Sequence, residues 1–464
     1  MPTVPDILNF PYQQDAEPLF ARLRHLEGAI WFDSGKPRSL QGRFDIISAL
    51  PVCWLETRAG VTYRLSSHHE RQQCTDDLAT AADQLLDDMG TFREGYSHLP
   101  FIGGLMGYWR YDAGLASHGL QPRADPDRQP LPTQKLGWYG WALILNHQAR
   151  EGWLVFHPAC DSHTRTRIQD LLATSEASQS SSEPFSLAAP FRPLVARQQY
   201  LQAITRIQDY IAAGDCYQVN YTQRFSAPCQ GDPWSAYRTL RHTLPSPYGA
   251  YLNWDGEAVL CCSPERFLKV SVGQVETKPI KGTIARGTTV AEDEAHAIQL
   301  MNSAKDRAEN LMIVDLLRND LGRHCVPGSI RVPKLFALES FANVHHLVST
   351  VTGTLAPDST PLQLLHGAFP GGSITGAPKR RAMEIIAELE PCDRGLYCGS
   401  IGYMSANGRL DTNIAIRTLT VRDGQVHCWG GGGIVADSEP EKEYEESVQK
   451  VRVLMEALGD FASA

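Results

Sequence analysis

One lysine, Lys281, stands in a context from which a nucleophile could be built. It lies in TKPIKGTIARG, at the end of a predicted hairpin strand, between an isoleucine and a glycine. At an ordinary pKa of about 10.4, only ~0.04% of a lysine is neutral at pH 7. An apolar pocket that lowered the pKa to about 7.5 would make roughly a quarter of it neutral and nucleophilic. A solvated surface lysine is the alternative.

Two further residues could exchange protons beside that lysine. Glu265, in CSPERF, ends the preceding hairpin, so the two hairpins could bring Glu265 near Lys281. His346, in VHHLVS, carries a side chain whose ordinary pKa lies near neutral pH. A hydrogen-bonded histidine in the core is the alternative for His346.

Two predicted helices each carry two carboxylates one turn apart. Glu443 and Glu446 lie beside the apolar stripe of the C-terminal helix, and Asp306 and Glu309 repeat the pattern on an earlier helix. One carboxylate from each helix, completed by substrate oxygens, could hold Mg²⁺, because this ion keeps waters and favours few protein ligands. Two solvated acidic faces are the alternative.

An arginine and a glycine run near the C-terminus could bind an anion. Arg417 lies in LDTNIAIRTLTV, which we expect to form the middle strand of a three-stranded meander with GSIGYMS and QVHCW. Because both faces of that strand are apolar, its arginine must be paired or must wait for an anion. Gly430–Gly433 would let backbone N–H groups approach an anion, or would form a tight turn.

The segment GGSITGAPK is not a P-loop. Gly376 is followed by Ala-Pro-Lys rather than by Lys-Ser/Thr, and Pro378 interrupts the helix start that a P-loop requires. Its hydroxyls and amides could still serve a carboxylate at a helix N-terminus.

The elements that must position these residues are short strands and amphipathic helices. We expect helices over 77–89, 295–317 and 440–458, and hairpins that turn at 255–256 and 273–274. Strand pairs that fold back on themselves indicate antiparallel sheets with helices outside, and not a doubly wound parallel sheet.

Composition limits the class of protein. The 464 residues suggest two or three domains, and 43 basic against 52 acidic residues argue against nucleic acid or an anionic membrane as partner. We expect no signal peptide and no spanning helix. Eleven cysteines without a CxxC pair predict reduced thiols and a cytoplasmic protein. The serine-rich stretch 174–184 is expected to be a linker.

Taken together and in order, the motifs resemble those of the chorismate-utilising enzymes. The resemblance is dense from about 199 to 458 and looser over 10–157. It rests on SPERF, PIKGT, SAKDRAENLMIVDLLRND, VHHLVS, GGSITGAPKRRAMEII, GSIGY, IRT, GGGIVADS and EYEESVQKV. It implies an α+β fold like that of anthranilate synthase component I, with two antiparallel β-sheets packed as a sandwich and helices outside. It divides the chain into an N-terminal region (1–173), a linker (174–197) and a chorismate-binding catalytic region (198–464).

Two positions distinguish members of this family. Anthranilate synthases carry alanine at the third position of PIxGT, whereas the enzymes that form 4-amino-4-deoxychorismate carry lysine, which is Lys281 here. Gln218 stands where the water-adding isochorismate and salicylate synthases place a lysine base. The resemblance therefore implies amination of chorismate. Anthranilate formation and a non-catalytic tryptophan-binding subunit are the alternatives.

The resemblance also implies roles for the candidate residues. Lys281 would attack ring carbon C2 as the C4 hydroxyl leaves, with Glu265 as general acid, and ammonia would then enter at C4 and expel the lysine. Glu309 and Glu446 would bind Mg²⁺ at the ring carboxylate, with Asp306 and Glu443 behind them. The implied substrate-binding residues are Gln218, Thr283, His346, Ser373, Tyr403, Arg417, Gly431, Gly432, Gly433 and Lys450.

Ammonia must come from elsewhere, because no cysteine lies in a GxCxGxQ glutaminase motif. The implied source is a separate glutamine amidotransferase subunit. No pyridoxal-phosphate lyase segment is present, so pyruvate elimination to 4-aminobenzoate would belong to another enzyme. Asp33 departs from the glutamate or histidine usual at its position in the family's tryptophan pocket. The residues that match this pocket are Ser34, Gln41, Gly42, Arg43, Phe44, Pro247, Tyr248 and Gly249.

Overall fold

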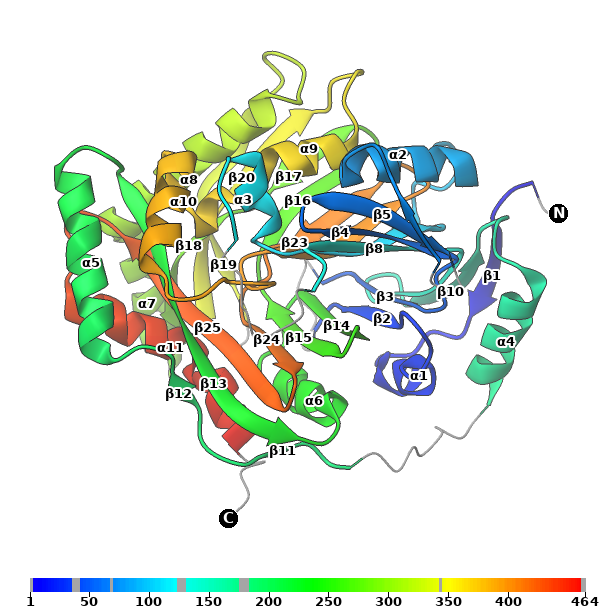
Figure 1. The fold of residues 1–464 in the computed structure, drawn as a ribbon, viewed down its shortest axis with the longest axis horizontal. Coiled ribbons are helices and arrows are strands. Elements are labelled where there is room, and N and C mark those ends of the chain that lie inside the picture. Colours follow the sequence, from blue (N-terminus) through cyan, green and yellow to red (C-terminus); the bar gives the residue numbers. More distant parts are fainter. Residues whose placement is uncertain are drawn as a thin grey trace.

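The computed structural model describes residues 3–35, 42–66, 70–122, 131–174, 183–341 and 344–459. Two large sheets with antiparallel pairing form the centre of the molecule, and helices cover their outer faces (Figure 1). A buried cluster that includes Ile144, Leu252, Met106 and Tyr108 joins the inner faces of the two sheets. The predicted α+β sandwich of two antiparallel sheets is confirmed.

Among the described residues, the first sheet has thirteen strands. In spatial order they are β1 (Asp6–Phe10), β10 (Glu151–Phe156), β9 (Trp141–Asn146), β3 (Phe44–Ser48), β2 (Ile30–Asp33), β14 (Tyr248–Trp254), β15 (Glu257–Ser263), β24 (Thr418–Arg422), β25 (Gln425–Ile434), β13 (Gln218–Gln230) and β11 (Ser186–Leu187), while β12 (Arg192–Pro193) and β21 (Gly376–Ala377) also pair with β13.

The second sheet has twelve strands in the part of the chain that the structure describes. In spatial order they are β18 (Ile280–Ala285), β20 (Val344–Thr354), β17 (Gln274–Thr277), β16 (Arg266–Ser271), β23 (Leu410–Asn413), β22 (Ser400–Ser405), β7 (Gly104–Trp109), β8 (Gln134–Tyr139), β4 (Cys53–Arg58), β5 (Val61–Ser66) and β6 (Arg71–Gln73), while β19 (Arg331–Ser340) pairs with β20.

The helices pack on the outside of both sheets (Figure 1). They are α1 (Glu17–Leu23), α2 (Leu78–Met89), α3 (Ala113–Ser117), α4 (Ser162–Ala173), α5 (Arg197–Ala212), α6 (Pro233–Thr243), α7 (Val290–Asn302), α8 (Ala304–Gly322), α9 (Pro361–Ala368), the 3₁₀ turn η1 (Gly372–Ile374), α10 (Lys379–Leu389) and α11 (Pro440–Gly459). None of these helices is long and apolar enough to cross a membrane.

Both sheets contain strands from both sides of the serine-rich segment. In the first sheet β2 pairs with β14, and in the second β22 pairs with β7. Residues 175–182 of the segment itself lie outside the described residues. The division at 173 and 198 stays a prediction, and the two regions it separates share both sheets.

The helices predicted over 77–89 and 440–458 form as α2 and α11, but the helix predicted over 295–317 is two helices. Ser303 is extended, ends α7 and caps α8, and its Oγ accepts a hydrogen bond from the Asp306 N–H at 3.2 Å. The apolar spacing continues through Ser303, so periodicity alone does not reveal the break. Serine is a favoured N-cap residue, and this is the signal that could have located it.

The predicted C-terminal meander is wrong. Strands β22 and β23 pair in the second sheet, whereas β24 and β25 pair in the first. Between Asn413 and Thr418 the chain crosses from one sheet to the other, and Arg417, at φ +49°, lies at this crossing. Because β23 and β24 are both buried, the apolar pattern of one long strand and of two short strands is the same.

Two smaller predictions also differ. Ser271 pairs with Gln274, so that hairpin turns at Val272 and Gly273, one residue earlier than expected. Gly430–Gly433 form no turn but lie within β25, paired with β13.

Candidate active site

Lys281 and Glu265 meet at Ser373. The Lys281 Nζ, on β18, donates a hydrogen bond to the Ser373 carbonyl oxygen at 3.0 Å. The Ser373 hydroxyl, on η1, donates to Glu265 Oε1 at 2.8 Å. Glu265 and Ser373 are buried, and Lys281 is half-buried rather than on the surface. The GGSITG segment thus joins the two residues that the sequence analysis expected to be neighbours.

The environment moves both pKa values toward neutral pH. Burial raises the pKa of Glu265 to about 7, although the Ser373 hydrogen bond and the Lys281 charge act in the opposite direction. Burial lowers the pKa of Lys281, while the Glu309 and Glu265 carboxylates oppose that change. A carboxyl with a pKa near 7 can donate a proton at neutral pH, and a lysine with a lowered pKa is a better nucleophile.

The predicted carboxylate pairs converge on the same lysine. The charges of Glu309 on α8 and Glu446 on α11 both act to raise the pKa of Lys281. The side chains of Glu309 and Glu443 are only 15% and 4% exposed, so these two are not solvated, whereas the side chain of Glu446 is 45% exposed. Lys305 Nζ lies 3.4 Å from Glu443 Oε1 and 3.9 Å from Glu309 Oε1. Lys305 was not predicted, although its i,i+4 spacing to Glu309 is a readable signal.

Lysines compensate the charge of these carboxylates. Lys450 Nζ lies 2.7 Å from Glu446 Oε1 and donates to the Gly431 carbonyl at 2.8 Å. Partial burial acts to raise the pKa of Glu446, but Lys450 holds it below its ordinary value. Burial raises the pKa of Glu309 in spite of the Lys281 charge. The remaining carboxylate, Asp306, packs against Gly282, where a Cβ would lie 2.9 Å from Asp306 Cγ.

The carboxylate pairs fit the ligand preference of Mg²⁺. A Cβ at Gly432 would lie 3.2 Å from Glu446 Oε1 and 3.3 Å from Glu443 Oε2, so the glycine leaves room for both carboxylates. Over the described ranges no group of three or more His, Cys, Asp or Glu residues could hold a metal ion. Substrate oxygens and water would therefore have to complete the coordination, as Mg²⁺ allows.

Gln218 is buried against the glycine strand without a hydrogen-bond partner. It is 0% exposed, and neither its Nε2 nor its Oε1 has a partner among the described residues. A Cβ at Gly433 would lie 2.2 Å from Gln218 Nε2, so a side chain at Gly433 would displace the Gln218 amide from this position. A buried amide without partners costs free energy, which a bound polar ligand would recover.

The Arg417 guanidinium is also available to bind a ligand. Within the described part of the chain its guanidinium makes no hydrogen bond or ion pair, so the structural ion pair considered as an alternative is not found there. Burial lowers the pKa of Arg417. Burial lowers the pKa of His346 to about 3, and the positive charge of Arg417 acts in the same direction. His346 is therefore neutral at pH 7, and its Nδ1 lies 2.7 Å from Thr283 Oγ1.

Tyr403 lies away from these contacts, in a second cavity of about 70 Å³ between β2, β14 and β22, separate from the Lys281 site. Its ring contacts Phe32 and Phe101 at centroid distances of 5.6 and 5.9 Å. No described contact brings Tyr403 to Lys281. The cavity is lined by Phe32, Asp33, Arg43, Phe44, Ile46, Pro247, Tyr248, Gly249, Arg266, Ile401, Tyr403, Asp411, Thr412 and Asn413.

Five of the residues predicted for a tryptophan pocket line this cavity: Arg43, Phe44, Pro247, Tyr248 and Gly249. The sequence analysis did not identify Phe32, Arg266, Asp411 or Asn413. These residues come from strands distant in sequence, and no local motif marks them.

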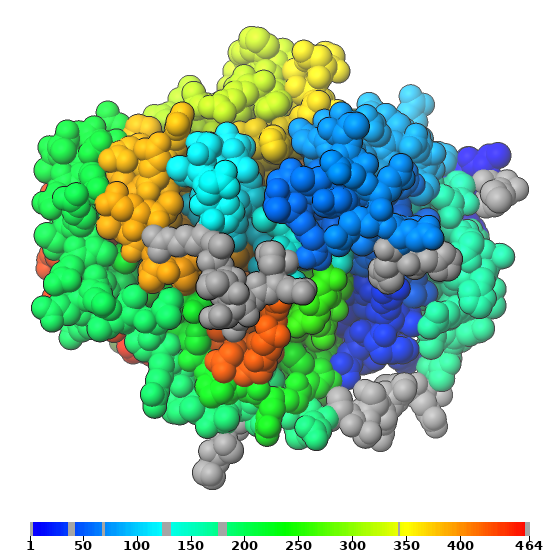
Figure 2. Space-filling view, viewed as in Figure 1, coloured from blue at the N-terminus to red at the C-terminus, as the bar shows by residue number. Residues whose placement is uncertain are grey.

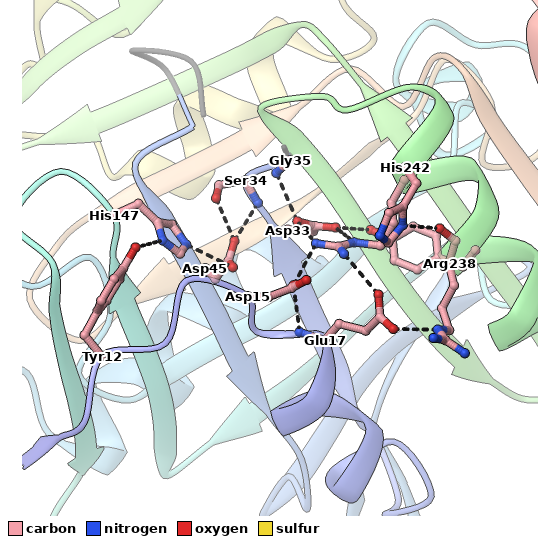
Figure 3. Close-up of polar contacts among 12 residues, drawn as sticks. Tyr12, Asp15, Glu17, Asp33, Ser34, Gly35, Asp45, His147, Arg238 and His242 are labelled. Carbon is pink, nitrogen blue, oxygen red and sulfur yellow. Dashed lines mark hydrogen bonds and ion pairs between the residues drawn. The ribbon is translucent and has the colours of Figure 1, made fainter. Parts of the chain in front are cut away.

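The remaining predicted pocket residues lie beside the cavity or outside the described residues. Ser34 donates from both its N–H and its Oγ to Asp45 Oδ1, each at 2.7 Å (Figure 3). Gly42 packs on Ser34, whose carbonyl oxygen would lie 2.3 Å from a Cβ at Gly42. Gln41 lies outside the described residues.

Asp33, which departs from the family pattern, is held by this protein's own groups. Its Oδ2 accepts from Arg241 Nε at 2.6 Å and from the Tyr237 hydroxyl at 3.2 Å. Its Oδ1 accepts from the Gly35 N–H at 3.0 Å (Figure 3) and from Arg241 Nη2 at 3.2 Å. The Asp33 carboxylate thus anchors α6 to β2 at the edge of the cavity.

The fold and site match one family of enzymes. Residues 29–456 match the family described as chorismate binding enzyme. The chain belongs to this family, which confirms the resemblance read from the motifs.

Individual relatives agree with this assignment. Aminodeoxychorismate synthase component 1 of Escherichia coli (strain K12) is 44% identical over 456 residues, which is 98% of each chain. Anthranilate synthase component 1 of Geobacillus stearothermophilus is 35% identical and covers 95% of this chain and 91% of its own. The structure of anthranilate synthase component I from Streptococcus pneumoniae TIGR4 matches with a TM-score of 0.76 and 31% identity, over 90% of this chain and 93% of that one.

Proposed function

We propose that this protein converts chorismate and ammonia to 4-amino-4-deoxychorismate. The observation that carries the proposal is Lys281, placed between the Ser373 carbonyl and two helices that supply carboxylates. The full-length relatives named aminodeoxychorismate synthase component 1 support the same reaction.

In the proposed reaction Lys281 acts as nucleophile. Its neutral Nζ attacks C2 of the ring, the two conjugated ring double bonds each shift by one position, and the C4 hydroxyl leaves as water with a proton from Glu265. Ammonia then attacks C4, the two double bonds return to their original positions, and the lysine amine leaves C2. The raised pKa of Glu265 and the lowered pKa of Lys281 support these two roles.

The other residues of the cluster would bind and orient chorismate. Arg417 has a guanidinium available for a carboxylate, and Gln218 has an amide available for a polar group of the ring. His346, neutral at pH 7, would accept or donate a hydrogen bond near the C4 hydroxyl without adding charge. The hydrogen bond between Thr283 Oγ1 and His346 Nδ1 would orient the His346 ring.

Glu309 and Glu446 would hold Mg²⁺, with Asp306 and Glu443 behind them. When bound, the ion would neutralise a substrate carboxylate that would otherwise face these side chains. Lys305 and Lys450 contact three of the four carboxylates and neutralise part of their negative charge.

Ammonia would come from a separate glutamine amidotransferase subunit, since the sequence offers no glutaminase motif. A cytoplasmic location is supported by the cysteines, all of which are free thiols.

We further propose that the second cavity binds tryptophan between Phe44, Pro247 and Tyr403. Equilibrium dialysis of the wild type and Phe44→Ala would test this, and equal retention of tryptophan would contradict it.

The assay that tests the reaction uses purified protein with chorismate, Mg²⁺ and ammonium, and identifies the product by mass spectrometry. We expect aminodeoxychorismate, and accumulation of fluorescent anthranilate would refute the proposal. Lys281→Ala should reduce turnover by about 10²-fold or more. The matched control is Lys278→Ala, because Lys278 is three residues away and pairs with Glu339 at 2.5 Å. Full activity of Lys281→Ala with ammonium would refute the covalent mechanism.

A further inference from the structure

The strand that carries Lys281 contains a β-bulge at the lysine itself. In the pairing of the two strands, β18 has two residues, Lys281 and Gly282, where β20 has only Leu347. Gly282 has a φ of +84°, a conformation that glycine adopts without strain. A bulge changes the direction of the side chains beside it relative to those of a regular strand. The direction in which Lys281 points therefore depends on this bulge.

A buried asparagine on α8 contacts β20 at the bulge. Asn310 is 0% exposed, and its Nδ2 donates a hydrogen bond to the Leu347 carbonyl oxygen at 3.3 Å. Its Oδ1 accepts from the Ser349 hydroxyl at 2.5 Å. The Ser349 N–H donates in turn to the carbonyl oxygen of Pro279, two residues before Lys281, at 3.2 Å. The Asn310 amide thus contacts, directly or through Ser349, the backbone opposite the bulge and the backbone just before it.

Stability alone does not account for an asparagine at this position. Most of the other buried residues of α8 are apolar, namely Ile313, Val314, Leu317 and Leu321. Asparagine is a poorer helix former than leucine, and a buried hydrogen-bonded amide gains little net free energy over its hydrated state. A leucine of similar volume would bury more apolar surface. The amide at Asn310 therefore indicates a role in the geometry of the strand that it contacts.

Helix α8 is also attached to β20 beyond its own C-terminal end. The Ala356 N–H donates to the His324 carbonyl at 2.9 Å, and the Val326 N–H donates to the Thr354 carbonyl at 2.8 Å. In Figure 2 the yellow-green residues that follow α8 lie beside the yellow residues that follow β20 at the top of the molecule. Removing the Asn310 amide leaves these attachments in place, whereas the residue opposite the bulge loses a hydrogen bond.

We propose that Asn310 is a positioning residue for the amination, whose side-chain amide stabilises the bulge and so directs the Lys281 amine toward the Ser373 carbonyl and the bound ring. The same bulge reaches His346, because the Gly282 backbone forms a hydrogen bond with the His346 side chain. A displacement of about 1 Å between reacting groups can cost about 10²-fold in rate. The inference deepens the proposed function and rests on it, because that reaction requires the amine to be in place.

The test replaces Asn310 by leucine, which has a similar volume and makes no hydrogen bond. With ammonium as the nitrogen source, kcat should fall by about 10-fold or more, while the KM for chorismate and the Mg²⁺ concentration for half-maximal activity should stay within twofold of wild type. Asn319→Leu is the matched control, because it makes the same change at an exposed position of the same helix, and it should keep the wild-type kcat.

Two kinetic outcomes would overturn the inference. One is a kcat of folded Asn310→Leu within twofold of wild type. The other is a rise in the Mg²⁺ requirement as large as the fall in kcat, because α8 and its Glu309 carboxylate would then have moved as a whole.

A labelling measurement examines the lysine without relying on the reaction. Acetic anhydride acetylates neutral amines, and peptide mass spectrometry follows the acetylation of Lys281 as a function of pH. Burial lowers the pKa of Lys281, so a loosened bulge in Asn310→Leu should move the labelling profile upward by about half a pH unit or more, whereas Asn319→Leu should match wild type. An unchanged profile would contradict the inference. If wild type forms no aminodeoxychorismate, the proposed function fails, and the labelling still decides whether Asn310 positions Lys281.

Ser349→Ala keeps the test decisive if Asn310→Leu does not fold. It removes the hydroxyl that donates to Asn310 Oδ1 and accepts from the Phe336 N–H, but it keeps the Asn310 hydrogen bond to Leu347. We therefore expect a smaller effect, with kcat lowered by about threefold and the labelling profile shifted in the same direction. A folded Ser349→Ala with wild-type kcat and wild-type labelling would overturn the inference.

Discussion

Replacing Glu265 by glutamine should slow catalysis and stabilise the folded protein at the same time. The change keeps the shape of the side chain and an oxygen that can accept from Ser373, whose hydroxyl donates at 2.8 Å. It removes the proton that a general acid must deliver, so kcat should fall by about 10²–10⁴-fold. It also removes a buried carboxylate that destabilises the fold when it ionises.

The size of the stability effect follows from the pKa of Glu265, which burial raises from 4.5 to about 7. Each pKa unit corresponds to about 1.36 kcal/mol, so ionising this carboxyl costs the folded state about 3 kcal/mol relative to the unfolded chain. Because the folded pKa is raised, the cost is absent below about pH 4.5, develops as pH rises, and is complete above about pH 7. The advantage of Glu265→Gln over wild type should therefore grow by about 3 kcal/mol between pH 4.5 and pH 8.

Urea denaturation of both proteins at pH 4.5, 6 and 8 measures this difference. Glu445→Gln is the control, because it makes the same chemical change at a residue that is exposed on α11 rather than buried. If the stability difference between Glu265→Gln and wild type stayed within 1 kcal/mol over this range, the carboxyl would ionise at an ordinary pKa. The reasoning about burial would then be refuted.

Three further substitutions test other parts of the structure. Arg417→Ala should raise the KM for chorismate by about 10-fold or more, because it removes the guanidinium proposed to bind a carboxylate of chorismate. An unchanged KM for chorismate, measured by initial rates, would contradict this. Gly432→Ala places a Cβ 3.2 Å from Glu446 Oε1 and should raise the Mg²⁺ concentration for half-maximal activity, whereas Gly322→Ala, whose Cβ has no neighbour closer than 3.8 Å, should not. Ser303→Ala removes the cap of α8 and should lower the free energy of unfolding by about 1 kcal/mol in urea, with no loss if the cap is unimportant.

Part of the site was readable from residue types alone. Asp306 and Glu309, and likewise Glu443 and Glu446, are one turn apart on their helices, and helix geometry fixes this neighbourhood before any tertiary contact forms. The order of motifs around Lys281 identified the family, because motif order is a property of the chain.

Other parts could not be read locally. The alternating pattern around Arg417 predicted a strand, but Arg417 has a positive φ and lies in the segment between β23 and β24 where the chain crosses from one sheet to the other. Gly430–Gly433 suggested an anion site or a turn, but they lie in β25, where a Cβ at Gly432 would crowd the Glu443 and Glu446 carboxylates and a Cβ at Gly433 would crowd Gln218. Tyr403 follows a family motif, yet its contacts lie in the second cavity.

The sequence by itself determined the family, the strand-rich antiparallel class and the acidic helices. It wrongly placed Lys281 at the end of a hairpin strand, whereas Lys281 lies near the start of the next strand, β18, which pairs with β20. Each correct prediction depends on neighbours along the chain, where periodicity, turn residues and motif order suffice. The tertiary structure alone decided that Ser373 joins Glu265 to Lys281, that Glu309 and Glu446 from two helices act on one lysine, and which pKa values move. Burial and through-space charge produce those effects, and both depend on residues that the fold, not the chain order, brings together.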